Sequence, residues 1–173
     1  MESISKKFSN SFQCADALEV SLSIEKQGFI YYDKAAKSAT DPRVRAIFLR
    51  LANEEKEHIQ SLQDKTRFIK PALANKARSQ ASRTKSFIKN EIHGKVFPIS
   101  EDFENGAGVA ENDFEALSIG INAEMKSIEL LSQLIASEKK MDVRVIFNHL
   151  LAEEKKHLLA LEELKKGLGQ KRE

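Results

Sequence analysis

The sequence predicts an all-α protein, and more specifically an antiparallel four-helix bundle made of two copies of one helical hairpin. Three observations support this fold class. The 173 residues include only 7 Gly and 3 Pro, too few for the many turns of a sandwich or barrel. Apolar residues recur three and four residues apart, which is the spacing of one helix face. Residues 17–62 also match residues 116–161 without a gap.

The internal repeat is clearest at VRAIFLRLANEEKEH, residues 44–58, which aligns with VRVIFNHLLAEEKKH, residues 143–157. Upstream of this stretch, Glu25 aligns with Glu124. We therefore expect one domain over residues 1–173, with hairpins at 17–65 and 114–168 and a long crossover at 66–113.

Turn and capping residues divide each copy into two helices. In the first copy the apolar stripe breaks before Pro42, which suits a first helical turn, with Thr40 or Asp41 as the cap. Residues 138–140 interrupt the second copy. Residues 112–115 have the pattern of a capping box, so a third helix is predicted to begin there.

The crossover is expected to contain a short helix at 76–92 and a loop at 101–112. Its charge is divided: residues 65–95 hold nine basic side chains and one acidic, whereas residues 96–115 hold six acidic and no basic ones. A solvated surface is the simpler interpretation, and a docking patch for an anionic partner is the alternative.

Composition excludes several classes of protein. The 28 basic and 26 acidic residues nearly cancel, so bulk charge predicts no nucleic-acid partner. The single cysteine cannot form an intramolecular disulfide or a multi-cysteine metal site. No apolar run approaches the ~20 residues that span a bilayer, and residues 1–12 lack the apolar stretch of a secretory signal. We therefore expect a cytoplasmic protein with no membrane association.

Six positions of the predicted apolar stripes carry ionisable side chains. An ionised carboxylate is costly to bury unless it is paired or bound to a cation, and four carboxylates close together would repel one another. The helix spacing predicts that they meet: each set lies ~20–25 Å from its hairpin turn at ~1.5 Å per residue. The six residues are Glu25, Glu55, His58, Glu124, Glu154 and His157.

This ligand set favours two divalent first-row metal ions. Their combined charge offsets the four carboxylates, and mixed oxygen and nitrogen ligation suits iron or manganese. Structural zinc generally takes a closed tetrahedral set rich in Cys and His, so it fits less well. The residues do not distinguish iron from manganese.

These motifs resemble the ferritin-like di-iron carboxylate superfamily, and within it the rubrerythrin family, in which two helices give one Glu each and two others a Glu-x-x-His. The resemblance covers both repeats. It implies two iron ions, with Glu25 and Glu124 as terminal ligands, Glu55 and Glu154 as bridges, and His58 and His157 as one imidazole for each metal. Tyr32 is similar to a tyrosine near the rubrerythrin site, so the resemblance gives it a catalytic role as a hydrogen-bond donor to a ligand carboxylate; a plain core aromatic is the alternative.

The sequence departs from that family in two ways. Rubrerythrins have an extra glutamate three residues after the third-helix ligand, where this chain has Ser127. They usually also carry a four-cysteine rubredoxin domain, which one cysteine cannot build. Without that domain, the electrons are expected to come from a separate donor protein. The resemblance also implies a homodimer.

Four other charged or titratable residues lie near these motifs or in the crossover. Glu54 and Glu153 point off the stripes and are interpreted as surface charges, with a supporting role beside the ligands as the alternative. His149 aligns with Arg50 and is interpreted as an exposed or boundary residue. His93 has no carboxylate at ligand spacing and is also expected at the surface.

Three functions are compatible with this pattern. The leading one is an oxidoreductase of rubrerythrin-like type, which reduces peroxide or dioxygen at the di-metal centre. The second is an iron-binding ferroxidase that stores iron, which requires a closed cage of many subunits. The third is an interaction module in which the metal only stabilises the bundle.

Overall fold

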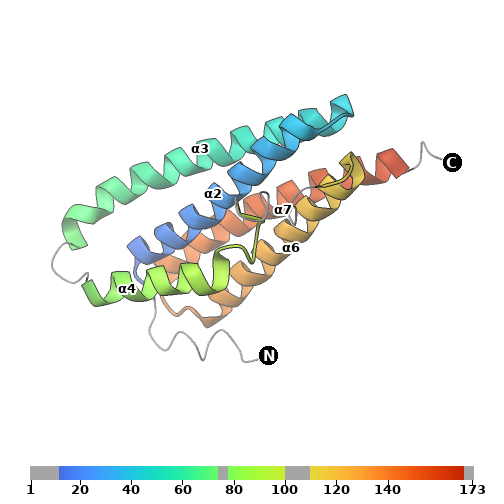
Figure 1. Cartoon of the computed structure of the whole chain (residues 1–173). Coiled ribbons are helices and arrows are strands. Elements are labelled where there is room, and N and C mark those ends of the chain that lie inside the picture. Colours follow the sequence, from blue (N-terminus) through green and yellow to red (C-terminus); the bar gives the residue numbers. More distant parts are fainter. Residues whose placement is uncertain (1–11, 74–77, 100–109, 170–173) are drawn as a thin grey trace.

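The computed structural model describes residues 12–73, 78–99 and 110–169, and four long helices form most of it (Figure 1). These are α2 (Cys14–Ser38), α3 (Pro42–Leu73), α6 (Asp113–Ser137) and α7 (Met141–Gly169). Helix α2 packs along α3 and α6 packs along α7, and the two hairpins meet largely through α2 and α7. The predicted all-α, ferritin-like bundle of two hairpins is confirmed.

The predicted helix starts are found at the expected residues. Helix α3 begins at Pro42, and the side chain of Asp41 caps it by accepting a hydrogen bond from the backbone N–H of Arg43 at 2.8 Å. Asn112 caps α6 by accepting from the N–H of Glu115 at 3.0 Å. The Glu115 carboxylate reaches back to the N–H of Glu111 rather than to that of Asn112, so one arm of the predicted capping box is present and the other is shifted by one residue.

Helix α3 is longer than expected. The sequence analysis placed the end of the first hairpin at residue 65, whereas α3 continues to Leu73. Residues 66–70 contain no Gly or Pro, so nothing in them stops the helix. The described part of α3 reaches Leu73, just past Pro71, which removes one backbone N–H from the helix.

The crossover contains the expected short helix, as α4 (Arg78–Phe87) followed by a π-helical turn, η1 (Ile88–Ile92). Gly94 then turns the chain with a φ of 69°, a conformation that favours glycine, and its N–H donates to the Gln27 side chain on α2. Thr84 donates a hydrogen bond to Asp16 at 2.7 Å, and Phe97 is buried. The crossover is thus packed onto α2. The loop predicted at 101–112 lies largely outside the described residues.

Buried aromatic residues pack toward both ends of α2. Near its start, the Phe12 ring meets the rings of Phe87 and Phe147, each at 5.7 Å between centroids. Near its end, Tyr32 stacks on Phe48 at 5.9 Å. The polar residues of the stripes lie between these two apolar regions. None of the described helices has an apolar stretch long enough to cross a membrane.

Asp113 joins the two hairpins at one end of the bundle. It is the first residue of α6, and its carboxylate accepts hydrogen bonds from Thr40 Oγ1 at 2.7 Å and from the Thr40 and Asp41 N–H groups at 3.0 and 2.5 Å. Partial burial alone would raise the pKa of Asp113, but these hydrogen bonds lower it below its ordinary value.

Replacing Asp113 with Ala is therefore expected to lower the free energy of unfolding by about 1–2 kcal/mol, since it breaks charge-assisted bonds that water partly screens. Because the folded pKa is below the unfolded one, this contribution is present at neutral pH and is lost as pH falls through the acid range of the carboxyl. Urea unfolding at pH 7 and pH 3 measures both effects. Asp33→Ala, which removes an exposed pair with Lys37, is the control and should change stability by less than about 0.5 kcal/mol.

Candidate metal centre

All four long helices direct polar side chains into the middle of the bundle. Helix α2 gives Glu25 and α6 gives Glu124, while α3 and α7 each give a Glu and a His three residues apart, on one helix face. The four glutamates are at most 2% exposed, and His157 is equally buried. His58 is the exception, with 24% of its side chain exposed.

The first cluster consists of Glu25, Glu55 and His58, whose ligand atoms all lie within 4.8 Å of one another. His58 Nδ1 is 3.3 Å from Glu25 Oε2 and 3.9 Å from Glu55 Oε2. This group has the size and the donor atoms to hold one metal ion.

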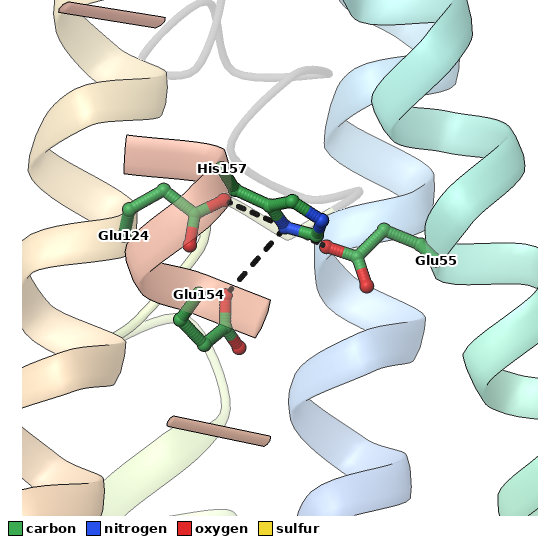
Figure 2. A group of neighbouring side chains, drawn as sticks. All are labelled: Glu55, Glu124, Glu154 and His157. Atoms are coloured by element: carbon green, nitrogen blue, oxygen red, sulfur yellow. Dashed lines mark ion pairs between the residues drawn. The ribbon is translucent and has the colours of Figure 1, made fainter. Parts of the chain in front are cut away.

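The second cluster consists of Glu55, Glu124, Glu154 and His157 (Figure 2). His157 Nδ1 lies between the three carboxylates, 3.4 Å from Glu55 Oε1, 3.6 Å from Glu124 Oε1 and 3.9 Å from Glu154 Oε2. Every member is buried, so this cluster is the drier of the two.

Glu55 belongs to both clusters. One of its oxygens faces His157 and the other faces His58, and the two imidazole rings lie nearly parallel with centroids 6.0 Å apart. A carboxylate with one oxygen toward each of two neighbouring sites is placed to bridge two ions. The structure brings Glu154 to the second cluster alone.

Buried polar atoms without a hydrogen-bond partner show that the clusters fit a cation. One carboxylate oxygen of each glutamate and Nδ1 of each histidine are buried and have no such partner. Leaving a buried polar atom unsatisfied is costly, and these residues form two clusters in which ligand atoms lie within 4.8 Å of one another. Bound divalent ions would satisfy them together.

The pKa values of these groups also show that the buried negative charge needs compensation. Burial and the adjacent Glu55 raise the pKa of Glu25, and burial raises that of Glu124 to about 8. Burial also opposes ionisation of Glu55, but the close approach of Glu25 and of both histidines lowers its pKa. The close carboxylates of Glu25 and Glu55 raise the pKa of His58 to about 10. Without metal, protons must therefore compensate the buried charge.

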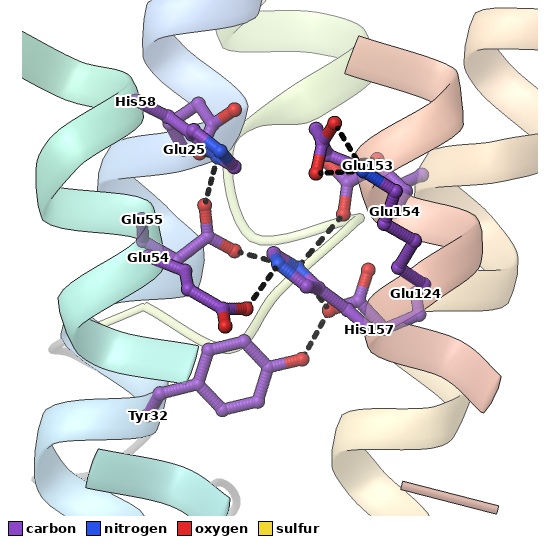
Figure 3. Close-up of polar contacts among 11 residues, drawn as sticks. Glu25, Tyr32, Glu54, Glu55, His58, Glu124, Glu153, Glu154 and His157 are labelled. Carbon is purple, nitrogen blue, oxygen red and sulfur yellow. Dashed lines mark hydrogen bonds and ion pairs between the residues drawn. The ribbon is translucent and has the colours of Figure 1, made fainter. Parts of the chain in front are cut away.

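Two neighbouring side chains fix the carboxylates of the second cluster (Figure 3). The Tyr32 hydroxyl donates a hydrogen bond to Glu124 Oε1, and Ser127 Oγ donates one to Glu154 Oε1 at 2.9 Å. Each bond satisfies Oε1 of its glutamate, and Oε2 of both glutamates is buried with no hydrogen-bond partner. The predicted contact between Tyr32 and a ligand carboxylate is thus present in the structure, and Tyr32 is also a fully buried core residue.

Comparison with known proteins agrees with this geometry. The model of the Rubrerythrin family matches residues 16–165, which include both repeats and the crossover. The chain belongs to the rubrerythrin family. Comparison with curated proteins and with solved structures finds no match.

A rubredoxin domain is not evident in the 173 residues of this rubrerythrin. The second departure noted in the sequence, Ser127, has a visible structural role, since its hydroxyl fixes Glu154 as described above. The equivalent position in the first repeat is Gly28, where an added Cβ would lie 2.8 Å from Glu55 Oε1. At this repeat position, Ser127 thus holds Glu154 by a hydrogen bond, whereas Gly28 leaves space for Glu55.

The Glu54 side chain is 41% exposed, as expected of a surface charge, and its Oε2 also lies 3.3 Å from His157 Nε2, which fits the alternative of a supporting role beside the ligands. A carboxylate at Nε2 orients the ring so that Nδ1 points at the metal position. Glu153, its equivalent in the second repeat, instead binds Lys156 at 2.8 Å. The residue equivalent to Lys156 is Glu57, which cannot pair with Glu54. The change from Lys156 to Glu57 between the repeats was therefore a sequence signal that Glu153 and Glu54 have different partners.

His149 and His93 are both exposed, as predicted. His93 follows η1 at the C-cap, and His149 lies on α7 among the residues that line a cavity beside His58.

Replacing Gly28 with Ala is expected to displace the Glu55 carboxylate, since the clash falls on the end of a flexible side chain. Iron retained after loading and desalting should fall, while the melting temperature of the metal-free protein stays the same or rises, because Ala favours the helix over Gly. Gly167→Ala is the matched control, as nothing lies within 4 Å of its added Cβ. Full iron retention by the Gly28 variant would show that Glu55 does not need this space.

Replacing Glu54 with Ala should weaken metal binding about tenfold, because His157 loses the carboxylate that orients it. Glu153→Ala is the control from the other repeat and should bind metal as the unmodified protein does. Competition with a chelator of known affinity measures both variants. Equal affinities in the two variants would contradict the orienting role of Glu54.

Proposed function

We propose that this rubrerythrin is a di-iron oxidoreductase that reduces peroxide or dioxygen with electrons from a separate donor protein. One observation carries the proposal: the Glu55 carboxylate lies between two clusters, each of which contains a histidine whose Nδ1 has no hydrogen-bond partner. This arrangement suits two neighbouring ions that act as a pair. When bound, two ferrous ions supply two electrons, one from each.

The donor atoms support iron, with manganese as the alternative. Four carboxylates and two imidazoles offer hard oxygen and borderline nitrogen ligands, which suit both ions, and the charge of two divalent ions offsets that of the carboxylates. Glu25 and His58 would hold one ion, and Glu124, Glu154 and His157 the other. Glu55 would bind both.

The protein's own side chains keep this centre in one geometry and largely dry. Tyr32 holds its hydroxyl proton toward Glu124, and Ser127 fixes Glu154 in the same way. Both hydroxyls are fully buried, so they hold the carboxylates without admitting water. Electrostatic interactions are strong in such surroundings.

Access differs between the two ends of the centre, and this difference supports catalysis over a purely structural metal. His58 is 24% exposed and lies at a cavity, whereas His157 is 3% exposed. A small oxidant can therefore approach from the His58 side. A metal that only stabilised the bundle would need no such opening, and an apolar core would stabilise it without burying four carboxylates.

Anaerobic loading with Fe(II) followed by desalting and elemental analysis tests this assignment. The unmodified protein should retain about two ions per chain. Glu55→Ala should retain at most about one, because it removes a ligand from both clusters. Glu57→Ala, an exposed glutamate on the same helix, is the control and should retain about two.

Addition of peroxide to the loaded protein then tests the chemistry. About one hydrogen peroxide should oxidise each pair of ferrous ions, since the reaction takes two electrons.

Iron retention in Glu55→Ala equal to that of the Glu57→Ala control would contradict the assignment of the metal site. Tight iron binding without oxidation by peroxide or dioxygen would contradict the oxidoreductase.

A further inference from the structure

A cavity of about 420 Å³ lies beside the candidate metal centre. It is lined by α2, α3 and α7, and its inner end is formed by Glu25 and His58 of the first cluster. Its walls are aliphatic and include Leu18, Leu62 and Leu150, which are buried. The cavity therefore connects an apolar space directly to the more exposed side of the centre.

The cavity is much larger than hydrogen peroxide or dioxygen requires. Either molecule is close in size to water, which occupies roughly 30 Å³ in the liquid. Cavities of 300–1,000 Å³ with apolar walls and a few polar groups are typical of sites for small organic molecules. The size and the lining thus indicate a ligand with an organic, apolar portion.

The cavity also has charged and polar lining residues. Glu25 and His58 are at the inner end, while the exposed Ser61, Lys65 and His149 also line the cavity. Val145 is 61% exposed and lines the cavity from α7. A ligand with a reactive polar group at one end of an apolar body matches this arrangement.

We propose that this cavity binds the organic group of an organic hydroperoxide, ROOH, and directs its O–O group toward Glu25 and His58. The inference rests on the proposed function, since it names the substrate class of the same centre. The reaction is ROOH + 2 e⁻ + 2 H⁺ → ROH + H₂O: the O–O bond breaks, the two electrons come from the reduced iron pair, and the external donor restores them. The protons come from solvent.

The second repeat does not open its metal cluster in the same way. The residue equivalent to Glu153 is Glu54, which lies against His157 (Figure 3). Glu153 instead lines the cavity and is paired with Lys156. The pairing of Glu153 with Lys156 leaves the His58 side accessible. The cavity is therefore a feature of one half of a duplicated site.

A tryptophan at Val145 tests the inference, because a large side chain at this exposed position should occupy the cavity without disturbing the core. The protein has no native Trp, so the new side chain also reports on its own surroundings by fluorescence. Leu159→Trp is the matched control: Leu159 is an exposed residue of the same helix, 57% accessible, and does not line the cavity. Val145→Phe is a milder second variant.

Two measurements on the iron-loaded full-length protein separate the cavity from the chemistry. The first is the binding of cumyl alcohol by calorimetry, which needs no turnover. The second is the ratio of kcat/KM for cumene hydroperoxide to kcat/KM for hydrogen peroxide. Val145→Trp should weaken cumyl alcohol binding and lower this ratio, each by about tenfold, with a smaller change in the same direction for Val145→Phe. Leu159→Trp should change neither.

The outcomes distinguish this inference from the proposed function. If the unmodified protein reduces hydrogen peroxide but does not bind cumyl alcohol, or if Val145→Trp leaves the ratio unchanged, the inference is overturned and the proposed function stands. If the unmodified protein reduces neither peroxide nor dioxygen, the proposed function is overturned, and the assignment of the ligand as a hydroperoxide with it. If it reduces dioxygen but neither peroxide, only that assignment is overturned. The inference is supported if Val145→Trp, but not Leu159→Trp, both weakens cumyl alcohol binding and lowers the ratio of the two kcat/KM values.

Discussion

The burial of four carboxylates and two imidazoles in the middle of a helical bundle is the constraint on which the rest of this structure depends. Desolvation disfavours every ionised form, and the carboxylates repel one another. Tyr32 and Ser127 each satisfy one carboxylate oxygen, yet no donor is placed at the oxygens that converge. The described residues thus fix the ligands from outside and leave the centre for a cation.

The repeat positions show how one hairpin sequence produces two different half-sites. Gly28 and Ser127 are equivalent, and each faces the glutamate of the neighbouring helix within its hairpin. Glycine leaves Glu55 the room to reach both clusters, whereas serine ties Glu154 to one. The residue at this one repeat position thus constrains Glu154 and leaves Glu55 unconstrained. The extra glutamate that the family resemblance implies at this position would meet Glu154 as a like charge rather than as a hydrogen-bond donor.

Much of the fold and the six candidate ligands could be predicted because helix periodicity is a local signal that the repeat states twice. Glu25 and Glu124, or His58 and His157, occupy equivalent positions, so a chance polar residue in one copy is ruled out by the other. The fold class followed from the same spacing, together with the scarcity of Gly and Pro.

The features that the sequence left open or did not predict depend on side-chain direction between helices rather than on residue spacing within one helix. Glu54 lies off its own apolar stripe, and only the packing of α3 against α7 brings it to His157. The predicted end of the first hairpin, residue 65, lies before Leu73 because the match between the two repeats stops at residue 62. The cavity could not be predicted, since it is the space that Leu62 and Leu150 leave between helices.

Because both repeats are parts of one chain, each half-site can change without the other. In a symmetric pair of identical hairpins, a substitution that opened one metal position would open both. Here His157 is only 3% exposed and has Glu54 beside it, while His58 is 24% exposed. Two ions bound at these positions would therefore differ in local dielectric, and the pair would not take up its two electrons at a single reduction potential.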